Sequence, residues 1–347
     1  MNKRFARRQI RKSPIAKAWP VIERLGCDGY SIVIDEPPEF FDQNEMSPYQ
    51  RLVTKFIQGV LSPKDLLDFD PESTAPIAFT EEALRREAKI KYRPIRMSPE
   101  YRDGTKGKRS RFGGLPLVPA DFEWPSRDGE FFEFLGQIFL DELPKSPARD
   151  SLPHDGSLLF FLDTIQNYTD AYIGSKVIYV SAGTKISQIA GHPRKPDSRP
   201  EWAYEDKIDP ATQATVQCDL IFRPRFFLPE ASPDPEDHKG ELDLALEAIG
   251  LEDVYDVFSE LKEQICENKK LGYNNYGHRL LGVQTSIQSS AIEHVRGDPF
   301  NSPKLLMQFT PFGAFQWGDV GHLHIFIEED ALAAGNFDHT AAVWECG

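Results

Sequence analysis

Short hydrophobic runs separated by turn residues are the dominant pattern of the chain beyond residue 110. The runs at 131–140, 158–163, 177–180 and 220–228 are rich in Phe, Leu, Ile and Val, and glycine- or proline-containing turns lie between them. Residues of these types favour strands, and short runs bounded by turns are typical of sheet proteins. The pattern therefore predicts a strand-rich body in this part of the chain.

The segment at 111–125, RFGGLPLVPADFEWP, leads into the first of these runs. Gly113 and Gly114 allow backbone angles that other residues avoid, and Pro116 fixes φ and removes a hydrogen-bond donor. Pro125 closes the segment. Because proline is excluded from central strands, we expect an extended arm here.

Gln137 lies inside the apolar run at 131–140. An amide that is buried without partners costs about 1–3 kcal/mol, so this side chain needs hydrogen bonds if it is buried. We expect it either to bridge to the backbone of a neighbouring strand or to line a cleft.

The first 95 residues have a different pattern. Residues 1–20 are basic, and we expect them to form a mobile tail. Ser47 begins a capping-box sequence followed by apolar residues at helical spacing, and Thr80 precedes acidic residues in the way that helix starts do. Residues 21–95 are therefore predicted to be a helical lead-in that packs on the body.

A longer helix is predicted at 241–269. Val254, Phe258 and Leu261 recur there at three- and four-residue spacing, and the opposite face is acidic. We expect this helix to cover one side of a sheet.

A weaker copy of the strand pattern follows the predicted helix. Gln308 corresponds to Gln137, Gly321 corresponds to Gly156, and LHIFIE at 323–328 corresponds to LLFFLD. An ordered set of matches indicates internal duplication. Two such halves would pack against each other, with Gln137 facing Gln308 across a groove.

The predicted fold class is therefore α+β, a strand-rich mixed body with two related halves and a helical N-terminal extension. The body is expected to span 96–347, with its halves at about 96–235 and 271–347 and the helix at 241–269 joining them.

The order FGGLP, WP, GQIFL, GSLLFF, HRLLG, LLMQF, WGDVGHL and IFI resembles the YwqG-like family, over roughly residues 95–345. The resemblance implies a mixed strand-rich fold with related halves and no settled reaction. Members resemble parts of toxin–immunity neighbourhoods, which implies protein binding. The helical lead-in, the basic tail and the histidines at 322 and 324 depart from the family pattern. The family's characteristic positions correspond here to Gly113, Gly114, Pro116, Trp124, Pro125, Gln137, Gly156, Gly282, Gln308, Trp317, Gly318, Asp319 and Gly321.

Charge is distributed unevenly along the 347 residues. The formal net charge is −14, yet residues 1–24 carry +7, so the remainder carries −21. An acidic body argues against a nucleic-acid surface over the whole protein, because phosphates repel it. The basic tail could contact nucleic acid or an acidic partner, or be a solvated end.

The cysteines at 27, 218, 266 and 346 are far apart and form no CxxC pair, which favours neither a disulfide framework nor a zinc knuckle. No apolar run approaches the roughly 20 residues of a membrane span. We expect a cytoplasmic protein without a membrane span.

His322 and His324 are the sharpest candidate for chemistry, because residues two apart on a strand share a face. The two histidines could form a metal site, but we expect them to face solvent. Leu323, Ile325 and Ile327 would then face the core. We expect no metal and no cofactor.

Four further groups enter the candidate site. Arg111 belongs to a basic stretch that can hold an anion, although 103–110 lacks the glycine of a phosphate-binding loop. Trp124 and Trp317 either cover the hydrophobic core or act as aromatic anchors of an interface. Asp319 is a turn residue near the groove. The candidate binding residues are Arg111, Trp124, Gln137, Gln308, Trp317 and Asp319.

No catalytic signature is present, so no catalytic residue is assigned. The leading hypothesis is a non-catalytic module that binds another protein, with a basic toxin or effector as the expected kind of partner. One alternative is a hydrolase or small-molecule enzyme with its site between the halves. Another is an accessory protein tethered to nucleic acid or membrane by its tail.

Overall fold

The computed structural model describes thirteen stretches of the chain and leaves out residues 36–108. The helices expected near Ser47 and Thr80 lie outside the described residues, as do Gly318 and Asp319. The described stretches are 3–11, 13–35, 109–163, 172–193, 208–209, 211–230, 241–250, 258, 277–287, 291–296, 300–312, 315–317 and 321–345.

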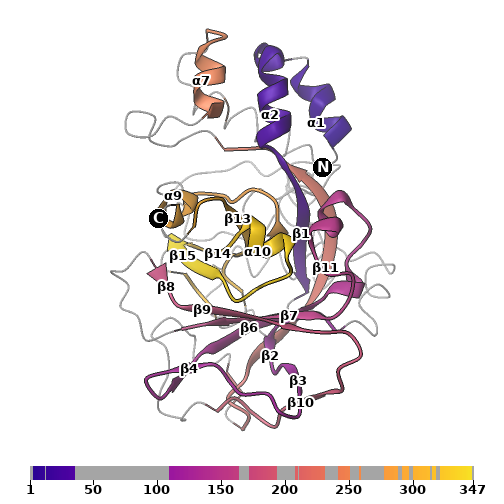
Figure 1. Cartoon of the computed structure of the whole chain (residues 1–347), viewed down its shortest axis with the longest axis vertical. Coiled ribbons are helices and arrows are strands. Elements are labelled where there is room, and N and C mark those ends of the chain that lie inside the picture. The colour runs from indigo at the N-terminus through magenta and orange to yellow at the C-terminus, as the bar shows by residue number, and fades with distance from the viewer. Residues whose placement is uncertain are drawn as a thin grey trace, which may run out of the picture. The chain divides into compact units, whose positions relative to one another are not determined.

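An eleven-stranded sheet forms the body, in the order β8-β15-β14-β13-β12-β1-β11-β2-β6-β7-β9 (Figure 1). All neighbouring strands are antiparallel. The strands are β1 (Cys27–Asp35), β2 (Arg111–Gly114), β6 (Glu133–Phe139), β7 (Ser157–Leu162), β8 (Tyr172–Ile173), β9 (Ser175–Val180), β11 (Thr215–Phe227), β12 (Arg279–Leu281), β13 (Pro303–Phe309), β14 (His322–Glu328) and β15 (Thr340–Glu345). Two small sheets pair β3 (Leu117–Pro119) with β10 (Ile186–Gln188), and β4 (Ser126–Arg127) with β5 (Glu130–Phe131).

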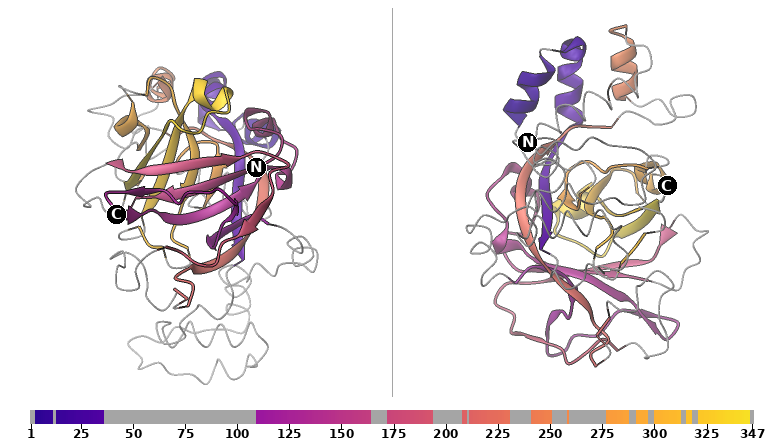
Figure 2. Two further views of the ribbon diagram at one scale, coloured as in Figure 1. Left: turned by 60° about the horizontal axis from the view of Figure 1, so that its bottom comes forward. Right: turned by 180° about the vertical axis from the view of Figure 1, so that it is seen from behind.

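The sheet curls so that its two ends approach each other (Figure 2). Lys176 on β9 pairs with Asp338, just before β15, with 2.5 Å between Nζ and Oδ1. The rings of Tyr179 and Phe337 lie 5.9 Å apart at the same place. The prediction of a strand-rich body is confirmed, and the body is a nearly closed sheet.

Strand β1 runs through the middle of this sheet, between β11 and β12. Tyr30 and Ile32 alternate toward the interior, where both are buried. The prediction that 21–95 is a helical lead-in is wrong for 27–35, because this stretch has the period of two that strands require. The preceding helix ends at Leu25.

Side chains from strands on both sides of β1 fill the interior of the sheet. The ring of Phe112 on β2 lies 5.0 Å from that of Phe309 on β13, and Phe160 on β7 lies 5.8 Å from Phe309. Phe312 packs 5.0 Å from Phe112. Each buried phenylalanine of this kind contributes about 1.5–3 kcal/mol. The middle of the predicted groove between the halves is therefore packed core.

Among the described residues, two groups cover the outer face of the sheet. Val118 of β3 packs on Phe134, Leu159 and Phe161, which point outward from β6 and β7. The short helix α9 (Ala291–Val295) packs in the same way on the outer side of β13, β14 and β15. Outward-facing residues of these strands are therefore buried as well.

The strand quartets β2-β6-β7-β9 and β12-β13-β14-β15 have matching registers. Arg111 lies opposite Gln137 in the first, and Arg279 lies opposite Gln308 in the second. The pairing of β6 with β7 shifts at Leu135, two residues before Gln137. The pairing of β13 with β14 shifts in the same way at Leu306, two residues before Gln308.

The N-terminal helices pack at one end of the sheet, against the end of β11 (Figure 1). Ala6 and Ile10 of the first helix are buried against Phe226, so residues 3–10 are a docked helix where the sequence predicted a mobile tail. The elements of this cluster are α1 (Lys3–Ile10), η1 (Pro14–Ala18), α2 (Trp19–Leu25) and α7 (Glu241–Glu247).

Helix α7 ends at Glu247, so the prediction of one helix over 241–269 is wrong. Gly250 has φ +84°, which lies outside the helical region, and its N–H donates to the carbonyl of Glu247. Glycine at this position is a common helix terminator. Phe258, which was predicted to face the core, is buried with the N-terminal helices.

Candidate functional site

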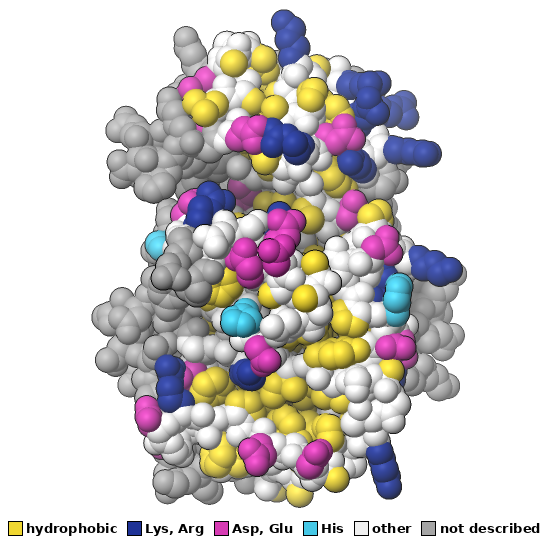
Figure 3. All heavy atoms as spheres, in the orientation of Figure 1, with side chains coloured by type: hydrophobic (Ala, Val, Ile, Leu, Met, Phe, Trp, Pro, Cys, Tyr) yellow, Lys and Arg dark blue, Asp and Glu magenta, His cyan; other side chains and the backbone are white. Residues whose placement is uncertain are grey.

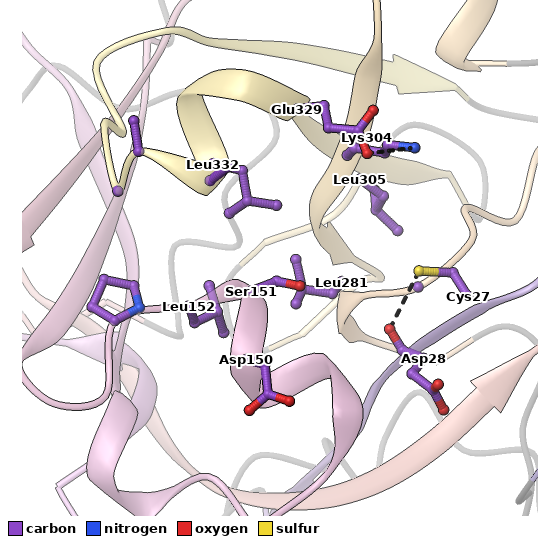
Figure 4. A pocket seen from close by; sticks show the side chains of 15 residues that line it. Cys27, Asp28, Asp150, Ser151, Leu152, Leu281, Lys304, Leu305, Glu329 and Leu332 are labelled. Atoms are coloured by element: carbon purple, nitrogen blue, oxygen red, sulfur yellow. Dashed lines mark hydrogen bonds and ion pairs between the residues drawn. The ribbon is translucent and has the colours of Figure 1, made fainter.

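A pocket of about 630 Å³ opens where β1 and β12 meet the segments that follow β6 and β14 (Figure 4). Cys27 and Asp28 come from β1, and Leu281 and Gly282 from the end of β12. The short helices η4 (Pro147–Ser151) and α10 (Glu329–Ala333) supply the other walls, and η3 (Leu140–Glu142) precedes η4. The pocket thus joins residues of both predicted halves.

Backbone turns at the end of β12 shape the pocket's floor. Leu281 and Gly282 have φ of +57° and +95°, so the chain turns away from the sheet directly after β12. A Cβ on Gly282 would lie 2.5 Å from Cδ2 of Phe227, so glycine is required there by contact as well as by conformation.

Charge in the pocket is mainly negative. Asp28, Asp150 and Glu329 line it, against Lys304. Lys304 is already paired, with 3.4 Å between its Nζ and Oε1 of Glu329. A hydrogen bond from Ser302 and the Lys304 ammonium lower the pKa of Glu329, so this carboxylate stays ionised. Burial raises the pKa of Asp28.

Apolar side chains separate these charges. Leu281, Leu305 and Leu332 point into the pocket between the carboxylates (Figure 4). The pocket is therefore lined by apolar side chains and has carboxylates at its rim.

Cys27 does not have the properties of an activated nucleophile. Cys27 is exposed at the protein surface, yet desolvation by its surroundings raises the pKa of its thiol, whereas reactive cysteines have a lowered pKa. Its Sγ lies 3.4 Å from the carbonyl oxygen of Asp28. None of the described residues that line the pocket is a histidine. The described part of the site therefore contains no Cys–His or Ser–His pair.

Gln137 is fully buried and fixes the arm that precedes β3. Its Oε1 accepts a hydrogen bond from the N–H of Leu117 at 2.9 Å, and its Nε2 donates to the carbonyl of the same residue at 2.9 Å. Nε2 also donates to Oγ of Ser157 at 3.0 Å. The bridging role that the sequence predicted for Gln137 is confirmed.

Gln308 has the same role in the second quartet, where Thr285 takes the place of Leu117. The N–H of Thr285 donates to Oε1 of Gln308 at 2.8 Å, and Nε2 of Gln308 donates to the carbonyl of Gly277 at 3.1 Å. The prediction that Gln137 faces Gln308 is wrong, because each amide holds its own loop and four strands lie between them in the sheet.

His322 and His324 do share a face, but that face is buried. His322 is 3% exposed and His324 is 0% exposed, so the prediction that they face solvent is wrong. Nδ1–H of His322 and Nε2–H of His324 both donate to the carbonyl of Thr285, at 3.0 and 3.2 Å. The loop at 283–287 covers this face, and Leu323, Ile325 and Ile327 point into the core as predicted.

Thr285 is consequently held by four side chains. Arg279 donates to its hydroxyl at 2.6 Å, in addition to the contacts of Gln308 and the two histidines. Nη1 of Arg279 also donates to the carbonyl of Val283, and its guanidinium lies 4.7 Å from the ring centre of Phe227. Among the described residues no group of three or more His, Cys, Asp or Glu is arranged to hold a metal ion.

The other predicted binding residues lie apart from one another. Arg111 is 7% exposed, and burial lowers its pKa although Asp219 and Glu142 oppose that shift. Trp124 packs on the outer face, where its indole N–H donates to the carbonyl of Phe132 at 2.7 Å. Trp317 lies in the interior core.

Several glycines of the predicted structural motif have backbone angles that favour glycine. Gly113, Gly114 and Gly156 have φ of +63°, +69° and +86°, which other residues avoid. A Cβ on Gly321 would clash with the carbonyl oxygens of Trp317 and Glu345. Pro116 lies in the arm between β2 and β3, and the carbonyl of Pro125 accepts a hydrogen bond from Phe132 at 2.9 Å.

Replacing Gln137 or Gln308 with methionine should lower the free energy of unfolding by about 2–3 kcal/mol, because the backbone groups of Leu117 or Thr285 lose their partners while remaining buried. Urea unfolding followed by circular dichroism measures this loss. Gln217→Met on β11 is the control, since Gln217 is exposed. Equal losses at all three positions would contradict the structural role.

The pocket residues were not predicted from the sequence. They come from five stretches, at 27–28, 150–153, 281–282, 304–305 and 329–335, of which 281–282 overlaps the end of HRLLG and 304–305 the start of LLMQF. One available signal was Gly282, which the sequence placed among the motif positions without a role in a site.

No helix among the described residues is long and apolar enough to cross a membrane. No curated protein matches the chain. Residues 110–346 match a family described as a domain of unknown function, DUF1963. This match covers the strand quartets and the pocket apart from Cys27 and Asp28. The chain therefore belongs to the DUF1963 family.

Proposed function

We propose that this protein is a non-catalytic binding module whose pocket takes an arginine or lysine side chain of a basic partner protein. The observation that carries the proposal is the pocket's charge. Three carboxylates line it, and its one described cation, Lys304, is already paired with Glu329. A second cation would therefore find Asp28 and Asp150 available at the rim.

The shape of the lining supports the same kind of ligand. Arginine and lysine bury their methylene stems on apolar surface and keep the charged head near polar groups. Leu281, Leu305 and Leu332 form such a surface, and Asp28 and Asp150 lie beyond it. A purely apolar ligand would leave these carboxylates desolvated and unpaired, which is costly.

The acidic character of the chain indicates what kind of partner protein it would bind. With a net charge of −14, long-range attraction favours a basic protein, as a toxin or effector would be. We propose a cytoplasmic immunity or toxin-neutralising role. The free thiols of Cys27 and Cys218 are in keeping with a reducing compartment.

We further infer that the two strand quartets arose by internal duplication and that the family is the YwqG-like one. The matched registers at Gln137 and Gln308, and the matched bulges two residues before them, support a common origin. The pocket would then belong to neither half alone, because the residues that form its walls differ between the two halves.

Titration with N-acetyl-arginine methylamide, followed by amide chemical shifts, tests the pocket. We expect saturable shifts at Asp28, Gly282 and Leu305, with a dissociation constant of about 1 mM for a single side chain. The citrulline analogue has the same shape without the charge and should cause no saturable shift. Asp28→Asn combined with Asp150→Asn should remove binding.

The control variant combines Asp121→Asn with Glu130→Gln. Both residues are exposed and lie outside the pocket, and the change in net charge is the same. Loss of binding in this control, or shifts scattered over the acidic surface, would overturn the proposed site.

A further inference from the structure

The exposed side of helix α1 is strongly basic. Ala6 and Ile10 face the helical cluster and are buried, whereas Arg4, Arg7 and Arg8 are exposed on the other side. Arg11 follows the helix and is exposed too. Residues three and four apart lie on one face of a helix, so these four side chains form one surface. Figure 3 shows the dark blue side chains gathered at this end of the body.

Two acidic residues of the helical cluster form ion pairs with other cations. Glu23 pairs with Lys3 at 3.2 Å, and Glu241 pairs with Arg24. Glu23 also interacts electrostatically with Arg7, but its carboxylate is paired with Lys3. Among the described residues, neither Arg4, Arg7, Arg8 nor Arg11 forms an ion pair. The positive charge is therefore available to an external anion.

Docking of the helix fixes this surface in place. Because Ala6 and Ile10 are packed against Phe226, the arginines are presented from an ordered scaffold and not from a free tail. An ordered surface loses less conformational entropy on binding than a disordered one.

We propose that the arginine face of α1, defined by Arg4, Arg7, Arg8 and Arg11, binds the sugar–phosphate backbone of nucleic acid without sequence preference. Guanidinium groups match phosphate oxygens with two parallel hydrogen bonds. The four side chains recur along about 10 Å of helix, which allows contacts with successive phosphates.

An anionic membrane fits this surface less well. A helix that binds a bilayer inserts its apolar face, and the apolar face of α1 is already buried against the body. A flat membrane would also face the acidic remainder of the chain, which carries −21. A nucleic-acid strand is narrow, and charges beyond about 8 Å of it are screened at physiological salt.

Fluorescence anisotropy with a labelled 20-base-pair DNA duplex tests the proposal on the full chain. Binding should weaken with salt, with log K falling against log salt with a slope of about −3 to −4 for four phosphate contacts. Arg4→Gln combined with Arg8→Gln should reduce that slope by about 2 and weaken binding about tenfold or more in 50 mM salt. A slope near zero, or unchanged binding by this variant, would overturn the proposal.

Lys145→Gln combined with Lys185→Gln is the matched control, since both lysines are exposed and distant in sequence from α1. It makes the same change in net charge and should bind DNA like the wild type. Sedimentation with vesicles containing phosphatidylserine provides the second arm. Retention on vesicles without binding to DNA would assign the surface to a membrane and refute the nucleic-acid proposal. The pocket variants leave this surface intact, so the two proposals fail independently.

Discussion

Replacing Gly156 with alanine should lower the free energy of unfolding by about 3–5 kcal/mol, whereas the same change at Gly129 should cost about 1–2 kcal/mol. Both glycines have φ +86°, so the conformational penalty of an L-residue is the same at each. A Cβ at Gly156 would also clash with the carbonyl oxygen of Val180 and lie 2.8 Å from Cε2 of Tyr179. At Gly129 nothing lies within 4 Å of such a Cβ.

The added loss at Gly156 arises in the sheet. Ser157 opens β7 opposite Val180 of β9, and the carbonyl of Gly156 accepts a hydrogen bond from Leu140 at 2.9 Å. Moving the chain to admit a methyl group disturbs both contacts, and overpacking of this kind costs about 1–3 kcal/mol. Denaturant unfolding of the two variants measures the difference. Equal losses would show that conformation alone, and not the contact with β9, requires glycine.

Lowering the pH from 7.5 to 5 should destabilise the protein by about 4 kcal/mol through two histidines alone. Burial lowers the pKa of His278 and of His324 to about 3. An unfolded chain binds a proton on each near pH 6.5, so below that pH the unfolded state holds more protons than the folded state. The contribution of these two neutral imidazoles to stability is therefore fully present above pH 6.5. Between pH 6.5 and 3 the free energy of unfolding falls by about 1.4 kcal/mol per pH unit for each histidine.

Single substitutions separate this effect from the titration of other groups. His278→Gln and His324→Gln should each reduce the loss between pH 7.5 and 5 by about 2 kcal/mol, whatever they do to stability at pH 7.5. His339→Gln is the control, because His339 is exposed. Free energies of unfolding at the two pH values provide the test. A pH dependence that is unchanged in His278→Gln and His324→Gln would show that these imidazoles are protonated in the folded protein.

The sequence predicted those parts of the fold whose signals are local. The runs that form β6, β7 and β14 contain consecutive apolar residues, and the partners of Gln137 follow from the cost of burying an amide. Gly113 and Gly114 were expected to adopt backbone angles that other residues avoid, and both have positive φ.

Features that depend on distant partners were missed. β1 begins with Cys27-Asp28-Gly29 and is recognisable as a central strand only beside β11 and β12. The burial of His322 and His324 depends on the loop at 283–287, which a strand's own alternation cannot reveal. The pocket is a product of tertiary structure in the same sense, because its carboxylates belong to β1, η4 and α10.

The central position of β1 has a consequence for how the protein is made. Cys27 pairs with Phe227 and Gly29 with Leu281, so both neighbours of this strand leave the ribosome long after it does. At about 5–20 residues per second, roughly 10–50 seconds separate β1 from its last neighbour. The strand has two unpaired edges until β11 is made and one until β12 is made, and unpaired edges are sites of mispairing. We therefore expect this protein to depend on chaperones during translation more strongly than proteins whose sheets are of similar size but pair strands that are close in sequence.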